Sequence, residues 1–250
     1  MKVQSEWHKK FFKNSFYNPA SSVSVKRAGD EVDFVVKTLN LKKGSEILDL
    51  CCGPGRHSIL LAKRGFSVAG LDFSNDYISE AKKKARKARL KINFIKGDMR
   101  NFRFKNKFDA VINMFTSFGY FKKFSDDIKV LKEVCKSLKP RGLFLIDTLN
   151  GDWLRKNFRS RRWQKLLNGV YQLEETELAK DKKSAINRWI RIKPDGKIQE
   201  RIFYLRLYDK KLMSSVLKKA GLTPLKFWGN FKGQKLSGKS NRLIALARKK

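Results

Sequence analysis

Between residues 46 and 149 the sequence alternates short apolar segments with helix-like segments, and this alternation constrains the fold more than any other feature. Ile78, Ala81 and Ala85 recur at helical spacing in one such helix, and Ser74 is a suitable N-cap for it. Continuous apolar strands joined by helices are typical of a parallel sheet covered on both faces. The expected strands are 46–52, 66–72, 92–98, 108–115 and 142–149, and the expected helices are 56–65, 74–90 and 125–142.

The pattern changes after residue 150. Two β-like runs flank the sequence KPDGK, which predicts a hairpin turn at 193–197. A helix is expected at 209–221, followed by two strands that end the chain. We therefore predict an α/β, Rossmann-like fold with a seven-stranded, mostly parallel sheet, helices on both faces, an antiparallel last strand and a small antiparallel β lid. The expected divisions are an N-terminal helical cap (1–40), a core (41–150), a lid or insertion (151–208) and a completion of the core sheet (209–250).

The segment DLCCGPGRHS, residues 49–58, joins the first expected strand to the first helix. Its glycines let the backbone approach a ligand closely, and open α/β sheets bind ligands at the carboxyl ends of their strands. Asp72 ends the second strand and Asp98 the third, so these carboxylates converge on the same edge. Each alone could be an ordinary turn residue. Together they predict a nucleotide-like ligand, with Asp72 placed to accept hydrogen bonds from ribose hydroxyls.

Other site types fit less well. The phosphate-binding pattern G-x-x-x-x-G-K-[ST] is absent, and the glycine spacing departs from the G-x-G-x-x-G of dehydrogenases, which stay as an alternative. The three cysteines form no C-x-x-C, and only two histidines are present, so no metal site is predicted. We interpret Cys51 and Cys52 as small packing residues, with a reactive thiol as the alternative.

The formal net charge of +35 predicts attraction to anions, including non-specific binding of nucleic acids. The basic residues are spread along the chain, so charge alone does not select a function. No apolar run is long enough to cross a bilayer, and the first residues contain no apolar signal core. These features, with the odd cysteine count, predict a cytoplasmic protein that does not enter membranes.

Five segments together resemble the motifs of the class I S-adenosylmethionine-dependent methyltransferases. They are EILDLCCGPGRHS, GLDFS, KGDMRNF, FDAVINMFTSFGYF and LKPRGLFLIDTLN, and they occur in the family's order over residues 30–150. The first glycine of the family's G-x-G-x-G is Cys51 here, and because cysteine is small we expect the turn to survive. The resemblance implies that residues 41–150 bind S-adenosylmethionine and that the product is S-adenosylhomocysteine.

The resemblance also implies which residues hold the cofactor. Asp49 and Gly53 would lie beside the methionine moiety, Asp72 on the ribose, and Asp98 and Met99 around the adenine. Asn113 and Phe115 would face the methyl end. With Tyr17, which could close the site from the N-terminal cap, the full set of predicted cofactor residues is Tyr17, Asp49, Cys51, Gly53, Asp72, Phe73, Asp98, Met99, Asn113 and Phe115. The implied reaction is an in-line displacement at the sulfonium methyl, which depends on positioning more than on acid–base groups.

The acceptor is harder to infer. The motifs of base-modifying methyltransferases are absent, which favours transfer to an N or O atom of a small molecule. An RNA methyltransferase and a non-catalytic nucleotide-binding module stay as alternatives. The segment 155–165 is basic and contains Phe158 and Trp163. It could line a nucleic-acid groove, but we favour a solvated helix with both aromatic side chains packed inward.

Two residues are candidates for positioning the acceptor. Tyr120 carries a hydroxyl in the aromatic segment FTSFGYF. Arg206 lies in an otherwise apolar strand, where a structural ion pair and a substrate role are both open. If Arg206 faces the cavity, it would select an acceptor that carries a carboxylate or a phosphate.

Overall fold

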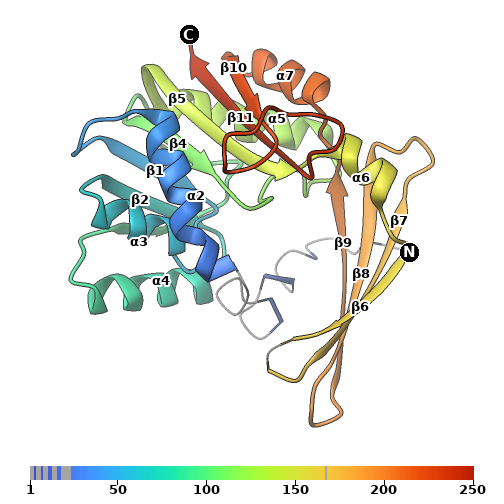
Figure 1. Cartoon of the computed structure of the whole chain (residues 1–250). Helices are drawn as coiled ribbons and strands as arrows, with labels where there is room; N and C mark the ends of the chain where they lie inside the picture. The colour runs from blue at the N-terminus through green and yellow to red at the C-terminus, as the bar shows by residue number, and fades with distance from the viewer. Residues whose placement is uncertain (1–2, 4–6, 8–10, 13–15, 18–23, 167) are drawn as a thin grey trace.

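Seven strands form one sheet in the order β10-β11-β5-β4-β1-β2-β3. We describe it in a computed structural model that covers residues 3, 7, 11, 12, 16, 17, 24–166 and 168–250 (Figure 1). The strands from β5 to β3 pair in parallel, whereas β11 is antiparallel to both β5 and β10. This confirms the predicted sheet. The strands are β1 (Glu46–Leu50), β2 (Ser67–Asp72), β3 (Asn93–Lys96), β4 (Phe108–Asn113), β5 (Leu138–Leu149), β10 (Leu222–Trp228) and β11 (Arg242–Lys249).

Helices cover both faces of this sheet, because its central strands bury successive side chains on opposite sides. Ile47 packs with α2 and α3 in one core cluster, and Leu48 packs with α5 and α7 in another. Helix α4 lies next to α3 and packs on Phe94 of β3. No described helix is long and apolar enough to cross a bilayer. The helices are α2 (Ser24–Leu39), α3 (Arg56–Lys63), α4 (Asn75–Lys87), α5 (Phe124–Ser137) and α7 (Lys210–Lys219).

A second sheet follows the fifth core strand. Helix α6 (Gly151–Asn157) leads into four antiparallel strands in the order β6-β7-β8-β9. Figure 1 shows this sheet extending away from the core sheet. The predicted antiparallel β lid is therefore present, and we refer to these four strands as the lid sheet. They are β6 (Arg161–Lys165), β7 (Tyr171–Leu178), β8 (Ser184–Ile192) and β9 (Ile198–Arg206).

The described residues near the N-terminus pack against the lid sheet. We call Val3, Trp7, Phe11, Phe12, Phe16 and Tyr17 the N-terminal strap. The strap forms an aromatic cluster with Phe203 of β9, and the Tyr77 hydroxyl of α4 donates to the Tyr17 carbonyl. The strap thus contacts both the lid sheet and the core. The predicted helical cap is helical in α2, and most of its first part lies outside the described residues.

The prediction for segment 155–165 was wrong. Helix α6 ends at Asn157, and Arg161–Lys165 is the edge strand of the lid sheet. Its residues pair with β7, a contact distant in the sequence that local periodicity does not reveal. Phe158 and Trp163 do not pack inward, because Trp163 is 69% exposed and Phe158 36%. The helix predicted at 125–142 also ends early, since the backbone becomes extended at Leu138, two residues before Pro140.

Candidate functional site

The turn after β1 combines left-handed backbone with one carboxylate. Cys51 (φ 62°) and Gly53 (φ 54°) both adopt positive φ, a region that glycine enters without steric cost. Cys51 stands where a first glycine was expected, and the turn is intact. The Gly53 N–H donates to Oδ2 of Asp72 at 2.9 Å. This bond joins the turn to the end of β2.

Asp72 lies at the carboxyl end of β2, beside the turn after β1. Its Oδ1 accepts a hydrogen bond from the Ser74 N–H at 2.9 Å, and its Oδ2 accepts the one from Gly53. Burial raises the pKa of Asp72 to about 6, while the two amide hydrogen bonds oppose the shift. Each carboxylate oxygen has two acceptor sites. Asp72 therefore has capacity left for two more donors, such as the paired hydroxyls of a ribose.

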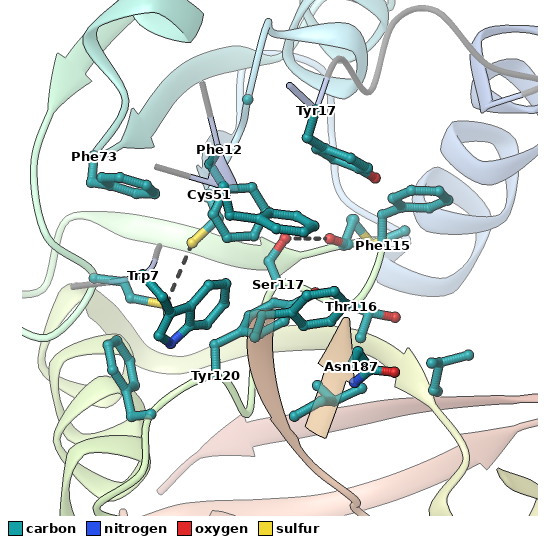
Figure 2. Close-up of a pocket in the computed structure, with 18 of the residues that line it drawn as sticks. Trp7, Phe12, Tyr17, Cys51, Phe73, Phe115, Thr116, Ser117, Tyr120 and Asn187 are labelled. Carbon is teal, nitrogen blue, oxygen red and sulfur yellow. Dashed lines mark hydrogen bonds between the residues drawn. The ribbon is translucent and has the colours of Figure 1, made fainter. Parts of the chain in front are cut away.

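Two further predicted residues follow β3. Asp98 accepts a salt bridge from Arg100 at 2.6 Å. The sulfur of Met99 lies 3.4 Å from that of Cys51, so the end of the third strand touches the turn of the first (Figure 2). Asp72, Asp98 and the turn line one cavity. The structure thus brings these residues together, as expected for the carboxyl ends of adjacent parallel strands.

The loop after β4 holds two non-glycine residues at positive φ, Phe115 (60°) and Thr116 (56°). Such strain persists only where the surroundings fix it. Here Asp147 of β5 does so, because its Oδ2 accepts from the Phe115 N–H at 2.9 Å and its carbonyl from the Thr116 N–H at 3.0 Å. The guanidinium of Arg56 also lies over the Phe115 ring, 4.6 Å from its centroid.

A buried ion pair supports this loop. Arg242 of β11 contacts Asp147 at 2.6 Å and donates to the Thr116 hydroxyl at 3.0 Å. Burial raises the pKa of the Asp147 carboxyl, and Arg242 opposes that shift. The sequence did not point to this pair, since Asp147 and Arg242 are 95 positions apart, although Asp147 lies within the motif-like segment LKPRGLFLIDTLN. Arg242 also lines the cavity.

Two predicted cofactor residues, Asp49 and Asn113, do not line the cavity. Asp49 accepts a hydrogen bond from the Ser58 hydroxyl at 2.6 Å. The Asn113 amide donates to the Leu50 carbonyl at 2.9 Å, and its own oxygen is buried without a hydrogen-bond partner among the described residues. Both side chains therefore support the turn after β1 from the side away from the cavity.

The cavity has a volume of about 1740 Å³ and extends from the sheet edge to the inner face of the lid sheet. Single-ligand pockets usually measure roughly 300–1,000 Å³, so this one has room for two ligands. The predicted residues that line it are Tyr17, Cys51, Gly53, Asp72, Phe73, Asp98, Met99, Phe115 and Tyr120.

Aromatic side chains from three parts of the chain enclose the far half of the cavity. Trp7 of the strap lies 5.5 Å from Tyr120, and Phe12 lies 6.0 Å from Phe73, between ring centroids (Figure 2). Trp189 and Phe203 complete the wall from the lid sheet. Burial raises the pKa of Tyr120, so its hydroxyl stays protonated and can donate a hydrogen bond.

The inner face of the lid sheet adds polar groups. The Thr176 hydroxyl donates to the Asn187 side-chain oxygen at 3.0 Å, and Figure 2 shows Asn187 facing the same space as Thr116 and Tyr120. Arg162 and Glu174 also line the cavity. Sequence analysis missed these residues. The alternation in SAINRWIRI puts Asn187 and Trp189 on one face, but it does not tell which face is inward.

Arg206 does not meet the condition set for an acceptor role, because it is absent from the cavity wall. Its Nε donates to the fully buried Asp127 of α5 at 2.8 Å, and Nη2 donates to the carbonyls of Phe121 and Lys122. The Tyr208 hydroxyl donates to the same Asp127 oxygen at 2.6 Å. Arg206 thus forms the structural ion pair, which joins the lid sheet to the core.

The paired cysteines show no sign of reactivity. Burial raises the pKa of both the Cys51 and Cys52 thiols well above the ordinary value, and nearby carboxylates add to the shift. Thiols of this kind stay protonated and are poor nucleophiles. Across the part of the chain that the structure describes, no group of three or more His, Cys, Asp or Glu residues is arranged to hold a metal ion.

Comparison with protein families identifies the core. A family model described as a methyltransferase domain matches residues 47–142. The glycine/sarcosine N-methyltransferase of Parasynechococcus marenigrum (strain WH8102) is 31% identical over 76% of this chain and 68% of its own length. The dTDP-3-amino-3,4,6-trideoxy-alpha-D-glucopyranose N,N-dimethyltransferase of Streptomyces venezuelae is 34% identical over 42% of this chain, which spans 43% of that enzyme.

Comparison with solved structures extends the likeness to the lid sheet. The crystal structure of an S-adenosylmethionine-dependent methyltransferase from Clostridium acetobutylicum ATCC 824 superposes with a TM-score of 0.79. It covers 92% of this chain and 94% of that one at 22% identity. At this identity the likeness shows the shared fold.

Proposed function

This chain belongs to the class I S-adenosylmethionine-dependent methyltransferases, and we propose that it methylates an N or O atom of a small molecule bound under the lid sheet. The observation that carries the proposal is the shape of the cavity. Its volume of about 1740 Å³ exceeds what one cofactor needs, and aromatic side chains enclose its far half. A site of this shape suits a compact acceptor better than a polymer.

The residues at the carboxyl ends of the core strands fit the cofactor. Asp72 has acceptor capacity left for the ribose hydroxyls, and the turn at Gly53 leaves space for close approach of a ligand. Asp98 and Met99 line the same cavity, and we expect them to bracket the adenine. When bound, S-adenosylmethionine supplies an electrophilic methyl group on its sulfonium. The faces of nearby aromatic rings favour such a cation.

The half of the cavity beside the lid sheet acts by positioning the methyl acceptor. Trp7, Tyr120 and Trp189 line the same cavity as Phe115, and a site that holds two reactants side by side keeps them in a reactive arrangement. The Tyr120 hydroxyl and the Asn187 amide can each donate a hydrogen bond to an acceptor. Transfer to nitrogen is favoured by the relatives, since two of them are named for action on amino groups.

The cysteines are free thiols, which supports the predicted cytoplasmic location.

A methyl-transfer assay tests the proposal. The protein is incubated with S-adenosylmethionine labelled in its methyl group and with either a panel of small amines and alcohols or total RNA. We expect label in at least one small molecule and S-adenosylhomocysteine as the second product. Transfer to RNA alone, retained at high salt, would instead support the RNA alternative. The observation that favours this alternative is a pair of exposed aromatic side chains, Trp163 and Tyr171, next to basic ones. The basic side chains are Arg161 and Lys165.

Binding of nucleic acid without transfer has a simpler origin. A protein with a net charge of +35 binds polyanions by releasing counterions, and such binding weakens steeply as salt increases. We therefore expect RNA binding to be lost between about 50 and 200 mM salt.

A further inference from the structure

A buried carboxylate on the inner face of the lid sheet has no role in the proposed cofactor site. Glu174 of β7 is 4% exposed and lines the cavity. Its Oε2 accepts from Nε of Arg162 at 2.7 Å, and its Oε1 accepts from the side-chain amides of Gln172 at 2.6 Å and Gln164 at 3.0 Å. A buried charge is costly unless it is paired and hydrogen-bonded. Here three neighbouring side chains supply the partners.

This network indicates what Glu174 does. Its Oε1 already accepts from two side-chain amides and its Oε2 contacts two nitrogens of Arg162, so Glu174, unlike Asp72, has no acceptor capacity left for a donor on the substrate. Instead it holds the guanidinium of Arg162 through Nε and Nη2. The Nη1 edge of Arg162 is left for another partner, and the Arg162 side chain is 62% exposed within the cavity mouth. A fixed, planar guanidinium is the group that binds carboxylates and phosphates in pairs of hydrogen bonds.

The position of Arg162 relates it to the acceptor. Thr176 and Asn187 form one cross-strand pair next to Tyr120, and Glu174 and Trp189 form the next inward-facing pair on the same strands. Two residues along a strand span roughly 6–7 Å. Arg162, opposite Glu174 on β6, therefore lies further from the core sheet than the Asn187 pair, at the outer end of the cavity.

A second cation lines the same side of the cavity but lies nearer the core sheet, because the carbonyl of the neighbouring Ser160 accepts from the Thr176 N–H at 2.9 Å. Arg159, just before β6, also borders the cavity, and it forms no ion pair with the residues that the structure describes. The wall of the cavity beside β6 thus carries two cations, Arg159 and Arg162, whereas the wall formed by the strap and Tyr120 is aromatic. This arrangement suits a molecule with an apolar or neutral reacting end and an anionic group that reaches β6.

We propose that the acceptor carries a phosphate or carboxylate group, which binds Arg162 at the outer end of the cavity, with Glu174 as the residue that positions Arg162. This inference rests on the proposed function, because it assigns the acceptor of that same site. It gives the lid sheet the anion-selecting role that Arg206 cannot fill.

Adjacent residues on β6 provide a matched control. Arg161 has the same charge as Arg162 but lies on the opposite face of the strand, where it pairs with Glu175 at 3.6 Å and is 85% exposed. Replacing either arginine with glutamine removes one positive charge from the same strand. Only the change at Arg162 removes the proposed site.

Calorimetry on the full chain with S-adenosylhomocysteine present tests the proposal, with inorganic pyrophosphate and glutarate as probes at about 150 mM salt to screen surface charges. We expect saturable binding of at least one anion. Arg162→Gln should weaken it about tenfold or more, whereas Arg161→Gln should change it less than about twofold. The preferred probe distinguishes a phosphate from a carboxylate acceptor.

Anion binding in single and double variants tests the role of Glu174 separately. Glu174→Gln should weaken anion binding when Arg162 is present and have no further effect in the Arg162→Gln background, which a general loss of structure would not reproduce. Equal effects of the two arginine variants, or no saturable binding of either anion, would overturn the proposal. Binding of S-adenosylhomocysteine is measured in the same samples, so failure of the cofactor site is seen separately.

Discussion

The turn after β1 and the inner face of the lid sheet line the same cavity, yet they hold their polar groups in different ways. At the turn, backbone N–H groups of Gly53 and Ser74 fix Asp72. On the lid sheet, side chains fix side chains, as in the Arg162–Glu174 and Thr176–Asn187 pairs. A backbone-built site depends on the fold and changes little with surrounding side chains. A site built from side chains can be altered by substitution without altering the sheet, so the lid sheet is the half suited to selecting an acceptor.

Loss of the Arg206–Asp127 ion pair, which joins the lid sheet to the core, should have the largest effect on the free energy of unfolding. Arg206→Ala leaves the fully buried Asp127 without its charged partner. Breaking a buried pair in this way costs about 3–5 kcal/mol of the free energy of unfolding, which chemical denaturation would measure. Affinity for S-adenosylhomocysteine in the folded protein should stay within about twofold. A loss of stability below about 1 kcal/mol would show that the joint does not depend on this pair.

Protonation of Asp72 should weaken cofactor binding at the carboxyl ends of the core strands and leave the lid sheet unaffected. Its pKa is raised to about 6, and hydrogen bonds from ribose hydroxyls favour the ionised carboxylate. Affinity for S-adenosylhomocysteine is therefore full above this pKa and is lost as pH falls through it, by about tenfold between pH 7 and pH 5. Calorimetry across this range checks the effect. In Asp72→Asn the pH dependence should disappear, and if it persists another group titrates.

The strap is tied to the lid sheet by weaker contacts. The guanidinium groups of Arg191 and Arg201 lie 4.8 and 5.0 Å from the centroid of the buried Phe16 ring. Phe16→Leu keeps an apolar side chain there but removes the ring, and we expect a loss of about 1 kcal/mol. A double-mutant cycle with Arg191→Met measures the coupling directly. A coupling energy near zero would mean that Phe16 acts by burial alone.

The outer face of the lid sheet should be least sensitive. Trp163 is 69% exposed, so Trp163→Ala should change the free energy of unfolding by less than about 0.5 kcal/mol. Thermal denaturation compares the variant with the parent protein. A loss above about 2 kcal/mol would indicate that Trp163 is covered, as the sequence had predicted.

Sequence analysis succeeded where the determining residues are local. The strand ending at Asp72, the helix capped by Ser74 and the turn at Gly53 each depend on a few adjacent residues, and the parallel sheet follows from their repetition. Ser74 does cap α4, accepting a hydrogen bond from the Tyr77 N–H. The carboxyl ends of adjacent strands then converge without further information.

It failed where a role depends on distant residues. Arg206 occupies an apolar strand, and only the position of Asp127 in α5 decides that its guanidinium points away from the cavity. Trp163 was placed in a helix because its pairing with β7 is not visible in local periodicity. The direction of Glu174 depends on which face of the lid sheet turns toward the core, and alternation alone cannot fix this.

The most direct test is titration of S-adenosylhomocysteine into the parent protein, Asp72→Ala and the control Asp76→Ala, which removes an exposed carboxylate from the first turn of α4. We predict micromolar affinity for the parent protein, about −8 kcal/mol, with Asp76→Ala unchanged. Asp72→Ala should lose about 1–3 kcal/mol, because the ribose hydroxyls and two backbone N–H groups lose their acceptor. Unchanged affinity in Asp72→Ala, or no binding by the parent protein, would contradict the assignment of the cofactor to this edge of the sheet.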